Sequence, residues 1–326
     1  MRFETKLLVI SFLIATALGY VIIPLLKKLK VGQIERDDGP ESHLKKQGTP
    51  TMGGIIMIIA LLITSIGVYI FEALTGKANI ANNLIPLVIV SIGFGIVGFI
   101  DDFKKLVLKN TKGLKPSYKM LGLLIISVIY VLYLIYGMNL GTEIVIPFLK
   151  TDITLPIYIY IPFAIVVMLG TTNAINLTDG IDGLSSSVST IIITCITLIG
   201  IMSGVWEISA FGSIAIGTII GFLMFNLHPA KVFMGDTGSL FLGGIISAMA
   251  LYLKIPILLL VIALIPVIET ISVIIQVMYF KKTGKRFFKM APLHHHFELS
   301  GWKESKIVIV FSLITLFLCA IGLVIV

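Results

Sequence analysis

Residues 173–183 concentrate the side chains that are best suited to chemistry. The stretch consists of Asn-Ala-Ile-Asn-Leu-Thr-Asp-Gly-Ile-Asp-Gly and lies between two long apolar runs. Ionisable groups beside membrane-length segments are costly and are functional candidates by default. Asn173 and Asn176 offer amide donors and acceptors that suit the ribose, base edge or phosphates of a nucleotide, and Asp179 follows three residues later. Asp182 suits the same site, or it simply caps the helix that follows.

Carboxylates at two other places beside apolar runs are functional candidates for the same reason. Asp101 and Asp102 end an apolar run, where both meet the partially negative C-terminal end of a predicted helix. Adjacent like charges add to that cost, so a cation must compensate, either the lysines that follow or a metal ion. Asp236 lies between glycines in Phe-Met-Gly-Asp-Thr-Gly-Ser, residues 233–239. The glycines let the backbone approach a ligand closely, and Phe233 offers a face on which a base can stack. Asp236 as an ordinary helix cap is the alternative.

Two basic connections complete the candidate set. The longest contains three successive histidines, His294, His295 and His296, which can donate hydrogen bonds to phosphate oxygens while partly charged. Zinc is a weaker interpretation, because the loops lack cysteine and the carboxylates favour a hard ion. Residues 48–54 precede the second apolar run, and their backbone N–H groups predict an anion site at a helix start. An ordinary helix start with Thr49 as the cap is the alternative.

The composition indicates the elements that must position these residues. Of 326 residues, 57% are hydrophobic and only 13% are charged, whereas a soluble domain has about a quarter charged residues. Apolar runs long enough to span a membrane as helices occur ten times. They cover residues 7–26, 55–71, 84–100, 119–136, 157–172, 184–203, 208–226, 239–253, 255–279 and 307–325. The predicted fold class is therefore all-α, a polytopic membrane bundle of about ten helices in one domain, residues 1–326.

Smaller features refine this bundle. Residues 141–156 alternate apolar and polar side chains and predict a small external β-hairpin. Glu269 lies inside the ninth run near Pro266, where a structural hydrogen bond is expected. Cys195 and Cys319 both fall within predicted spans, so no disulfide is implied.

Lysine and arginine predict the orientation. Twenty of the 25 fall in the connections after the odd-numbered spans, which the positive-inside rule places in the cytoplasm, with both termini outside. Every polar cluster lies in one of those connections. The basic surface suits anionic lipid and also a doubly phosphorylated substrate.

Taken in order along nearly the whole chain, these motifs resemble the signature motifs of the phospho-N-acetylmuramoyl-pentapeptide transferases, the MraY or translocase I family. The matching stretches are residues 49–54, 101–102, 173–183, 233–239 and 292–298. The resemblance implies a multi-pass enzyme of the bacterial inner membrane with a cytoplasmic active site, a Mg²⁺ cofactor, a homodimer and no nucleic-acid partner. It also implies transfer of phospho-MurNAc-pentapeptide from UDP-MurNAc-pentapeptide to undecaprenyl phosphate, which releases UMP and forms lipid I for peptidoglycan synthesis.

The resemblance further implies roles for single residues. Asp236 is the expected chief magnesium ligand, with Asp101 and Asp102 beside it. Asp101 is the candidate base for the lipid phosphate, and a covalent aspartyl-phosphate is the other route. The expected uridine side consists of Lys105, Asn176, Asp179, Asp182, Phe233 and Gly235, and Asn173 is a further expected substrate-binding residue. The residues expected to face the phosphates and the sugar–peptide are Lys46, Thr51, Lys119, His294, His295 and His296. A groove around a bent ninth span is expected to admit the lipid.

Two alternatives remain at this point. Within the superfamily of polyprenyl-phosphate N-acetylhexosamine-1-phosphate transferases, a UDP-GlcNAc-dependent GlcNAc-1-phosphate transferase is the runner-up, and the triple-histidine segment favours the muramoyl branch. A membrane transporter is more distant, because transporters place polar residues near mid-membrane and these carboxylates gather at one face.

Overall fold

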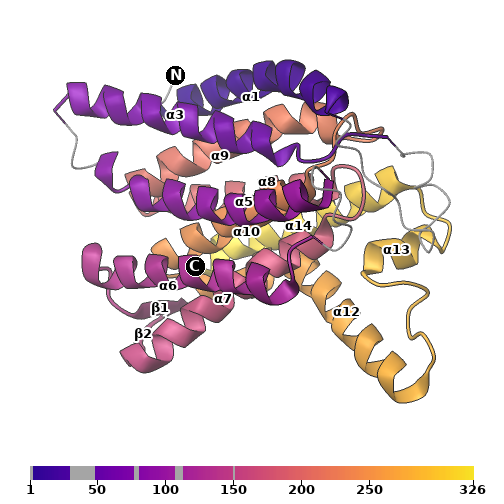
Figure 1. The fold of residues 1–326 in the computed structure, drawn as a ribbon. Coiled ribbons are helices and arrows are strands. Elements are labelled where there is room, and N and C mark those ends of the chain that lie inside the picture. Colours follow the sequence, from indigo (N-terminus) through magenta and orange to yellow (C-terminus); the bar gives the residue numbers. More distant parts are fainter. Residues whose placement is uncertain (1–2, 30–47, 77–80, 107–112, 150) are drawn as a thin grey trace.

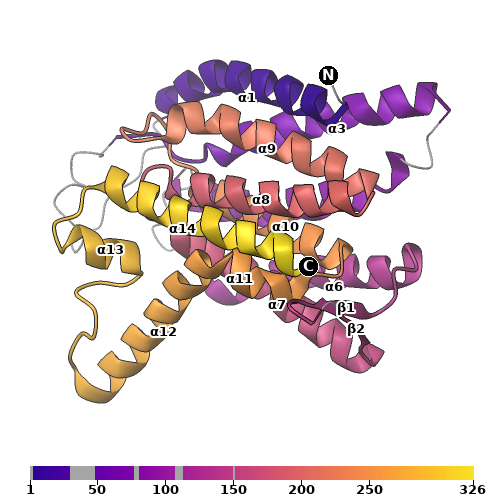
Figure 2. The ribbon, with the colours of Figure 1, turned by 180° about the vertical axis from the view of Figure 1, so that it is seen from behind.

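The computed structural model describes residues 3–29, 48–76, 81–106, 113–149 and 151–326. Within these ranges, nine helices are long and apolar enough to cross a membrane. Figures 1 and 2 show most of the long helices stacked side by side with their axes roughly aligned, while α12 lies at an angle to them. Their continuous apolar composition favours helices, since a spanning helix satisfies all of its backbone hydrogen bonds internally. The prediction of a polytopic helical membrane protein is confirmed.

The long helices follow the chain in an up-and-down order. They are α1 (Phe3–Lys28), α3 (Gly54–Leu74), α5 (Ile85–Leu106), α6 (Pro116–Leu132), α7 (Ile157–Thr178), α8 (Leu184–Met202), α9 (Trp206–Asn226), α10 (Gly235–Tyr252), α12 (Leu264–Thr283) and α14 (Glu304–Ile325). The short elements are the π-turn η1 (Tyr133–Gly137), the 3-10 turn η2 (Pro256–Leu258), α11 (Leu259–Ile262) and α13 (Leu293–Glu298).

Helix α10 forms the centre of the bundle. Every residue from Thr237 to Tyr252 is buried, and α10 packs mainly on α5 and α7. Glycines permit this close packing at its first turn. A Cβ on Gly98 of α5 would collide with the carbonyl oxygen of Asp236, and one on Gly54 of α3 would collide with the backbone of Gly238. Three helices therefore meet backbone to backbone where α10 begins.

The predicted ninth span, residues 255–279, is wrong as a single helix. The chain breaks at Ala263, between α11 and α12, and α12 leans away from the bundle (Figure 1). Pro266 accounts for the break, because its ring clashes with the carbonyl of Ile262 four residues earlier and it has no N–H to donate. Proline is tolerated in the first turn of a new helix, and Pro266 lies in the first turn of α12.

The predicted β-hairpin is confirmed, and its place outside the membrane stays a prediction. Strands β1 (Glu143–Ile146) and β2 (Thr151–Thr154) pair antiparallel, with Ile144 opposite Ile153. The β1 strand is tied to the end of α10, because the Val145 N–H donates to the Lys254 carbonyl at 2.8 Å. Lys254 also forms an ion pair with Glu143 at 2.6 Å, which lowers the pKa of the Glu143 carboxyl.

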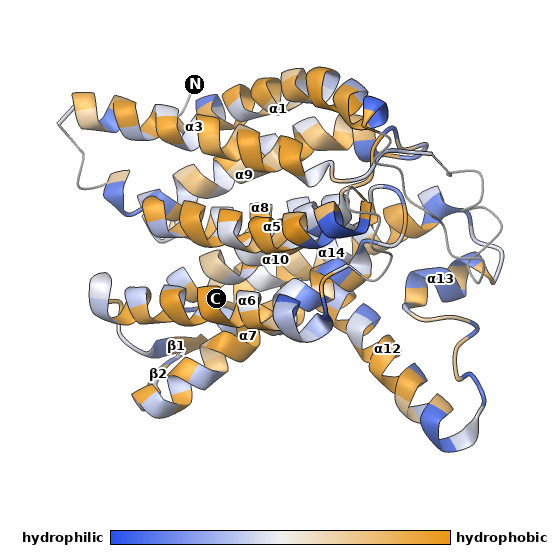
Figure 3. Cartoon of the chain, in the orientation of Figure 1, coloured by the Kyte–Doolittle hydropathy of each residue, from blue (hydrophilic) through white to orange (hydrophobic). Residues whose placement is uncertain are grey.

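The two ends of the bundle differ in polarity. Hydrophilic residues gather at the end that holds α13 and the C-terminal ends of α5 and α12 (Figure 3). The chain termini lie at the other end. There the Phe148 N–H donates to the Ile325 carbonyl at 3.1 Å, and Phe3 stacks on Trp206. The two termini therefore share one end, and the predicted polar clusters share the opposite end.

Candidate active site

Three carboxylates from two helices meet at the polar end. Asp101 and Asp102 come from the last turns of α5, and Asp236 from the first turn of α10. One oxygen from each lies within 4.8 Å of the others. Hard oxygen donors in such a group suit a divalent cation such as Mg²⁺, which takes one or two carboxylates together with substrate phosphates and water. The described donor set therefore fits the metal that the motifs imply.

Asp102 is directed at the start of α10. Its Oδ2 accepts hydrogen bonds from the Thr237 N–H at 2.8 Å and the Thr237 hydroxyl at 2.6 Å, and its Oδ1 accepts from the Asp236 N–H at 3.2 Å. The first N–H groups of a helix have no partner within the helix, and they carry its positive partial charge. The unfavourable position of Asp102 at the end of α5 is therefore offset by the start of α10.

Asp101 and Asp236 share two lysines. Lys105 Nζ lies 2.6 Å from Asp101 Oδ2 and 3.0 Å from Asp236 Oδ2. Lys119 Nζ lies 2.9 Å from the same oxygen of Asp236. The Leu114 N–H donates to Asp101 Oδ1 at 2.7 Å. These lysines supply the compensating charge that the sequence requires, and their flexible ammonium groups can also contact phosphate.

The end of α7 contributes an amide and a half-buried acid. Asn176 Nδ2 donates to Asp236 Oδ1 and to Ser239 Oγ, both at 2.8 Å. Asp179 follows the last residue of α7. Burial raises the pKa of the Asp179 carboxyl to about 8, and the charge of Asp236 adds to the shift. A carboxyl that keeps its proton near neutral pH can donate a hydrogen bond to a ligand.

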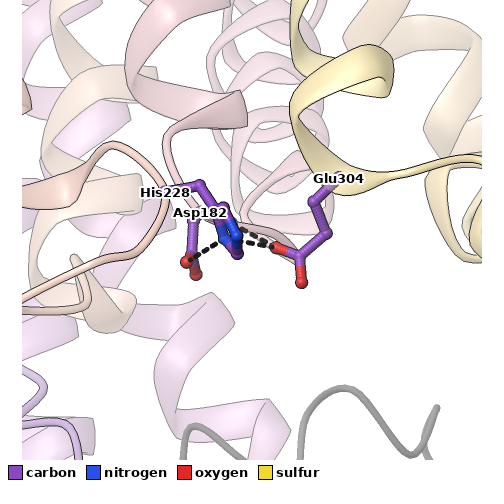
Figure 4. A group of neighbouring side chains, drawn as sticks. All are labelled: Asp182, His228 and Glu304. Carbon is purple, nitrogen blue, oxygen red and sulfur yellow. Dashed lines mark hydrogen bonds and ion pairs between the residues drawn. The ribbon is translucent and has the colours of Figure 1, made fainter.

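Asp182, His228 and Glu304 form a second group beside this site (Figure 4). Asp182 Oδ2 lies 3.0 Å from His228 Nδ1 and accepts the Ala230 N–H at 3.0 Å. Glu304 Oε2 lies 3.8 Å from the same ring nitrogen. Asp182 is therefore buried against the loop between α9 and α10. It does not act only as a cap of α8, because the cap position of that helix belongs to Gly183.

The connection before α3 packs on the loop before α10. The Gly53 N–H donates to the Phe233 carbonyl at 2.8 Å, and the Gly54 N–H donates to the Met234 carbonyl at 3.0 Å. The predicted anion site at these N–H groups is wrong, because backbone carbonyls already occupy them. The cap position of α3 is Gly53, so Thr49 as the cap is wrong as well.

Two predicted residues lie at this packed junction. Gly235 has a positive φ of 71°, and a Cβ there would lie 2.6 Å from an oxygen of Asp102 and 3.0 Å from Thr51 Oγ1. Thr51 is buried. Phe233 belongs to the same loop, and its stacking on a base stays a prediction. Lys46 lies outside the described residues.

The three histidines are not equivalent. His294 is fully buried, and its Nδ1 lies 3.3 Å from Oε2 of Glu269. His295 Nδ1 lies 2.7 Å from Glu298 Oε2. His296 Nδ1 accepts the Lys289 N–H at 3.2 Å. His294 is packed against the loop that carries Asp179, because a Cβ on Gly180 would collide with its ring.

Asn173 lies apart from the carboxylates. Its amide donates to the Leu169 carbonyl one turn earlier at 2.7 Å and reaches Met120 Sδ at 3.7 Å.

Sequence reasoning missed other residues that hold the site together. Asn226 donates to the Val232 carbonyl at 3.0 Å and accepts from the Ser186 hydroxyl at 2.7 Å, which braces the loop before α10. A buried amide at the end of an apolar span was the available signal.

An apolar cavity of about 350 Å³ lies between α7 and the broken ninth segment. Val166, Gly170 and Ala174 line it from one side, and Leu260, Val267 and Thr270 from the other. This cavity lies where the groove around a bent ninth span is predicted.

A larger cavity of about 650 Å³ lies at the opposite end of the bundle, among Tyr133, Glu207 and Lys254, and none of the predicted site residues lines it.

Comparison with known proteins agrees with this geometry. Residues 84–254 match the model of the family described as glycosyl transferase family 4. A phospho-N-acetylmuramoyl-pentapeptide-transferase of Acetivibrio thermocellus is 46% identical over 316 residues, which cover 96% of this chain and 92% of the relative. A protein of the same name from Clostridium botulinum (strain Alaska E43) is 48% identical, with 97% and 94% covered. One from Clostridium perfringens is 50% identical, also with 97% and 94% covered.

Proposed function

We propose a phosphotransfer to a lipid carrier for this chain, which belongs to the phospho-N-acetylmuramoyl-pentapeptide transferases of glycosyl transferase family 4. It transfers phospho-MurNAc-pentapeptide from UDP-MurNAc-pentapeptide to undecaprenyl phosphate, releases UMP and forms lipid I. In this reaction an oxygen of the lipid phosphate attacks the sugar-bound phosphorus, and the bond from that phosphorus to UMP breaks. The observation that carries the proposal is the meeting of Asp101, Asp102 and Asp236 in a chain that matches these relatives over nearly its full length.

Catalysis of such a transfer consists mostly of positioning and charge neutralisation. Two anionic substrates must approach each other, and the lysines that contact Asp236 are placed to receive their phosphates. Asp236 and Asp101 would hold the Mg²⁺ ion, with Asp102 beside them. When bound, the ion supplies positive charge to the phosphate oxygens at which negative charge develops.

Asp101 is the proposed base that takes the proton of the lipid phosphate. One of its oxygens contacts Lys105 and the other accepts the Leu114 N–H. Both oxygens of Asp102 face donors of α10, so Asp102 is poorly placed for a covalent aspartyl-phosphate. Direct attack by the lipid phosphate is the preferred route, and a covalent aspartyl-phosphate on Asp101 is the other.

The nucleotide and the lipid approach from different directions in this proposal. The uridine occupies the side of Asn176, Asp179 and Asp182, near Phe233 and Gly235. The prenyl chain lies in the apolar cavity between α7 and α12, whose lining suits hydrocarbon. The His294–His296 segment then faces the sugar and peptide.

The polar end is proposed to face the cytoplasm, where UDP-linked precursors are found. The excess of lysine and arginine in the connections at that end supports this orientation. A homodimer is proposed on the family resemblance.

One assay tests the whole proposal. Purified protein is supplied with UDP-MurNAc-pentapeptide, undecaprenyl phosphate and Mg²⁺, and UMP release is measured with each component omitted in turn. We expect release only when all three are present, and little release when UDP-GlcNAc replaces the muramoyl substrate. UMP release that does not depend on the lipid phosphate would contradict the proposal.

A further inference from the structure

Glu269 is a buried carboxylate that the reaction as described does not use. It is 1% exposed and lies in α12, three residues after Pro266 and beside the residues that line the apolar cavity. An ionisable group in a membrane-spanning segment is costly unless it has a partner, and such groups are usually functional. The identity of the partner therefore indicates what Glu269 does.

Both oxygens of Glu269 are directed at a single residue, His294. Oε1 accepts the backbone N–H of His294 at 3.2 Å, and Oε2 lies 3.3 Å from the ring atom Nδ1. The first contact is a hydrogen bond that places the backbone of His294. The second is a close approach of the carboxylate to the ring without a hydrogen bond, because neither Oε2 nor Nδ1 has a hydrogen-bond partner among the described residues. Because Nδ1 lies beside Glu269, Nε2 is the ring nitrogen on the other side.

That opposite nitrogen lies against the loop that follows α7. A Cβ on Gly180 would collide with His294 Nε2, so the ring rests directly on the backbone next to Asp179. Within the part of the chain that the structure describes, neither Nε2 nor Nδ1 has a hydrogen-bond partner, and the side chain is 0% exposed. A buried polar atom without a partner is costly. The ring is nevertheless held there, by Glu269 on one side and Gly180 on the other.

We propose that Glu269 is a positioning residue for the phosphotransfer, which acts by holding the His294 ring so that Nε2 faces the substrate beside the loop of Asp179. This inference rests on the proposed function. It also links two parts of the site, because α12 lines the apolar cavity and the loop after α7 borders the carboxylates.

The chain offers a matched control for simple anchoring. Gln276, two turns further along α12, also fastens the connection between α12 and α13. Its Oε1 accepts the N–H of Phe287 at 3.1 Å and of Phe288 at 2.9 Å. Gln276→Ala therefore loosens the same connection on the same helix and leaves the contact between Glu269 and His294 in place.

The test compares kcat and KM of the full-length wild type, Glu269→Gln and Gln276→Ala with UDP-MurNAc-pentapeptide and undecaprenyl phosphate. Glutamine keeps the shape of Glu269 but has one acceptor oxygen and no negative charge, so it cannot both accept the His294 backbone N–H and place an oxygen beside Nδ1. We expect kcat to fall about 100-fold in Glu269→Gln, the usual cost of a misplaced group, with KM for the nucleotide nearly unchanged. Gln276→Ala should stay close to the wild type. Equal losses in both variants would identify simple anchoring and overturn the proposal, as would normal kcat in Glu269→Gln.

A double-mutant cycle tests whether Glu269 acts through His294. We expect Glu269→Gln combined with His294→Ala to be no slower than His294→Ala alone, because residues that act as one unit are not additive. Losses that multiply would overturn the proposal. If Glu269→Gln does not fold, Gly180→Ala displaces the same ring from its other side and should lower kcat, whereas a Gly180→Ala enzyme with normal kcat would refute the inference. A wild type without activity refutes the proposed function instead, so the two failures are distinguishable.

Discussion

At the scale of single residues, the two neighbouring aspartates at the end of α5 have different surroundings. Asp102 is bound by the Thr237 N–H and hydroxyl at the start of α10. Asp101 contacts Lys105 and the Leu114 N–H, at the side where substrate phosphates are proposed to lie. Asp102 therefore joins α5 to α10, whereas Asp101 faces the lysine side of the site, where the proposed reaction takes place.

This difference predicts different defects for the two amide variants. Asp101→Asn removes the proposed base and should lower kcat by a factor of about 100 to 10,000, with little change in melting temperature. Asp102→Asn should lower both activity and melting temperature, because an amide oxygen and NH₂ cannot accept all the hydrogen bonds from Thr237 and Asp236. Turnover assays and thermal melts of the detergent-purified variants check this. Near-normal turnover in Asp101→Asn would remove its assignment as the base.

Asp179 predicts a pH dependence of stability. Its pKa is about 8 in the folded protein and 3.8 in the unfolded chain. As the pH rises, the unfolded chain therefore loses this proton before the folded protein does. The free energy of unfolding is highest below pH 3.8, as far as this group is concerned, and falls as the pH rises to about 8. The loss amounts to about 1.4 kcal/mol per pH unit for one group.

Asp179→Asn keeps a neutral side chain at every pH and should abolish this loss. We expect the melting temperature of the variant minus that of the wild type to increase from pH 5 to pH 8 and then to level off. Melts in buffer with EDTA at each pH measure the difference. A difference that is constant across this range would show that Asp179 ionises normally in the folded protein.

At the scale of elements, the site depends on how closely α10 approaches α3 and α5. Gly98 and Gly54 lie where the first turn of α10 touches these helices, and the atoms that they approach belong to the backbone. Backbone atoms cannot rotate away as a side chain can, so a methyl group at these positions must shift a helix.

Gly98→Ala should therefore displace the turn that carries Asp236. We expect a destabilisation of about 1–3 kcal/mol and a clear loss of turnover. Gly67→Ala in α3 is the matched control, because nothing lies within 4 Å of a Cβ at Gly67. Thermal melts and UMP release compare the two variants. The packing argument fails if the two substitutions behave alike.

The cavity between α7 and α12 predicts a defect specific to the lipid. Gly170 lines this cavity, and a Cβ at this position would have no neighbour within 4 Å. Gly170→Leu should fill the space and raise KM for undecaprenyl phosphate about tenfold, which corresponds to a loss of about 1.4 kcal/mol. KM for the nucleotide should not change. Gly67→Leu is the control in another membrane helix, and an unchanged lipid KM in Gly170→Leu would place the lipid elsewhere.

At the scale of the whole molecule, the sequence predicts the membrane bundle and the gathering of its acidic clusters at one end. Length and apolar composition are local properties, so the spans could be located one by one. A bend in the ninth span was expected, but its division into two helices at Ala263 was not, because apolar residues continue on both sides of the break. The N–H groups of Gly53 and Gly54 were misjudged because their partners, the carbonyls of residues 233 and 234, are distant in the chain. The pairing of Glu269 with His294 was not predicted for the same reason, because the two residues are distant in the chain.

The orientation of the whole bundle is the last prediction. The polar end carries the excess of lysine and arginine, so it should face the cytoplasm. Both native cysteines, Cys195 and Cys319, are buried, so single introduced cysteines can report the side. A membrane-impermeant maleimide applied to intact cells should label Thr151→Cys in the hairpin, and it should label Lys285→Cys after α12 only once the membrane is opened. Both positions are exposed in the structure. The reverse pattern would place the carboxylates outside, away from UDP-linked precursors, and the proposed reaction could not take place there.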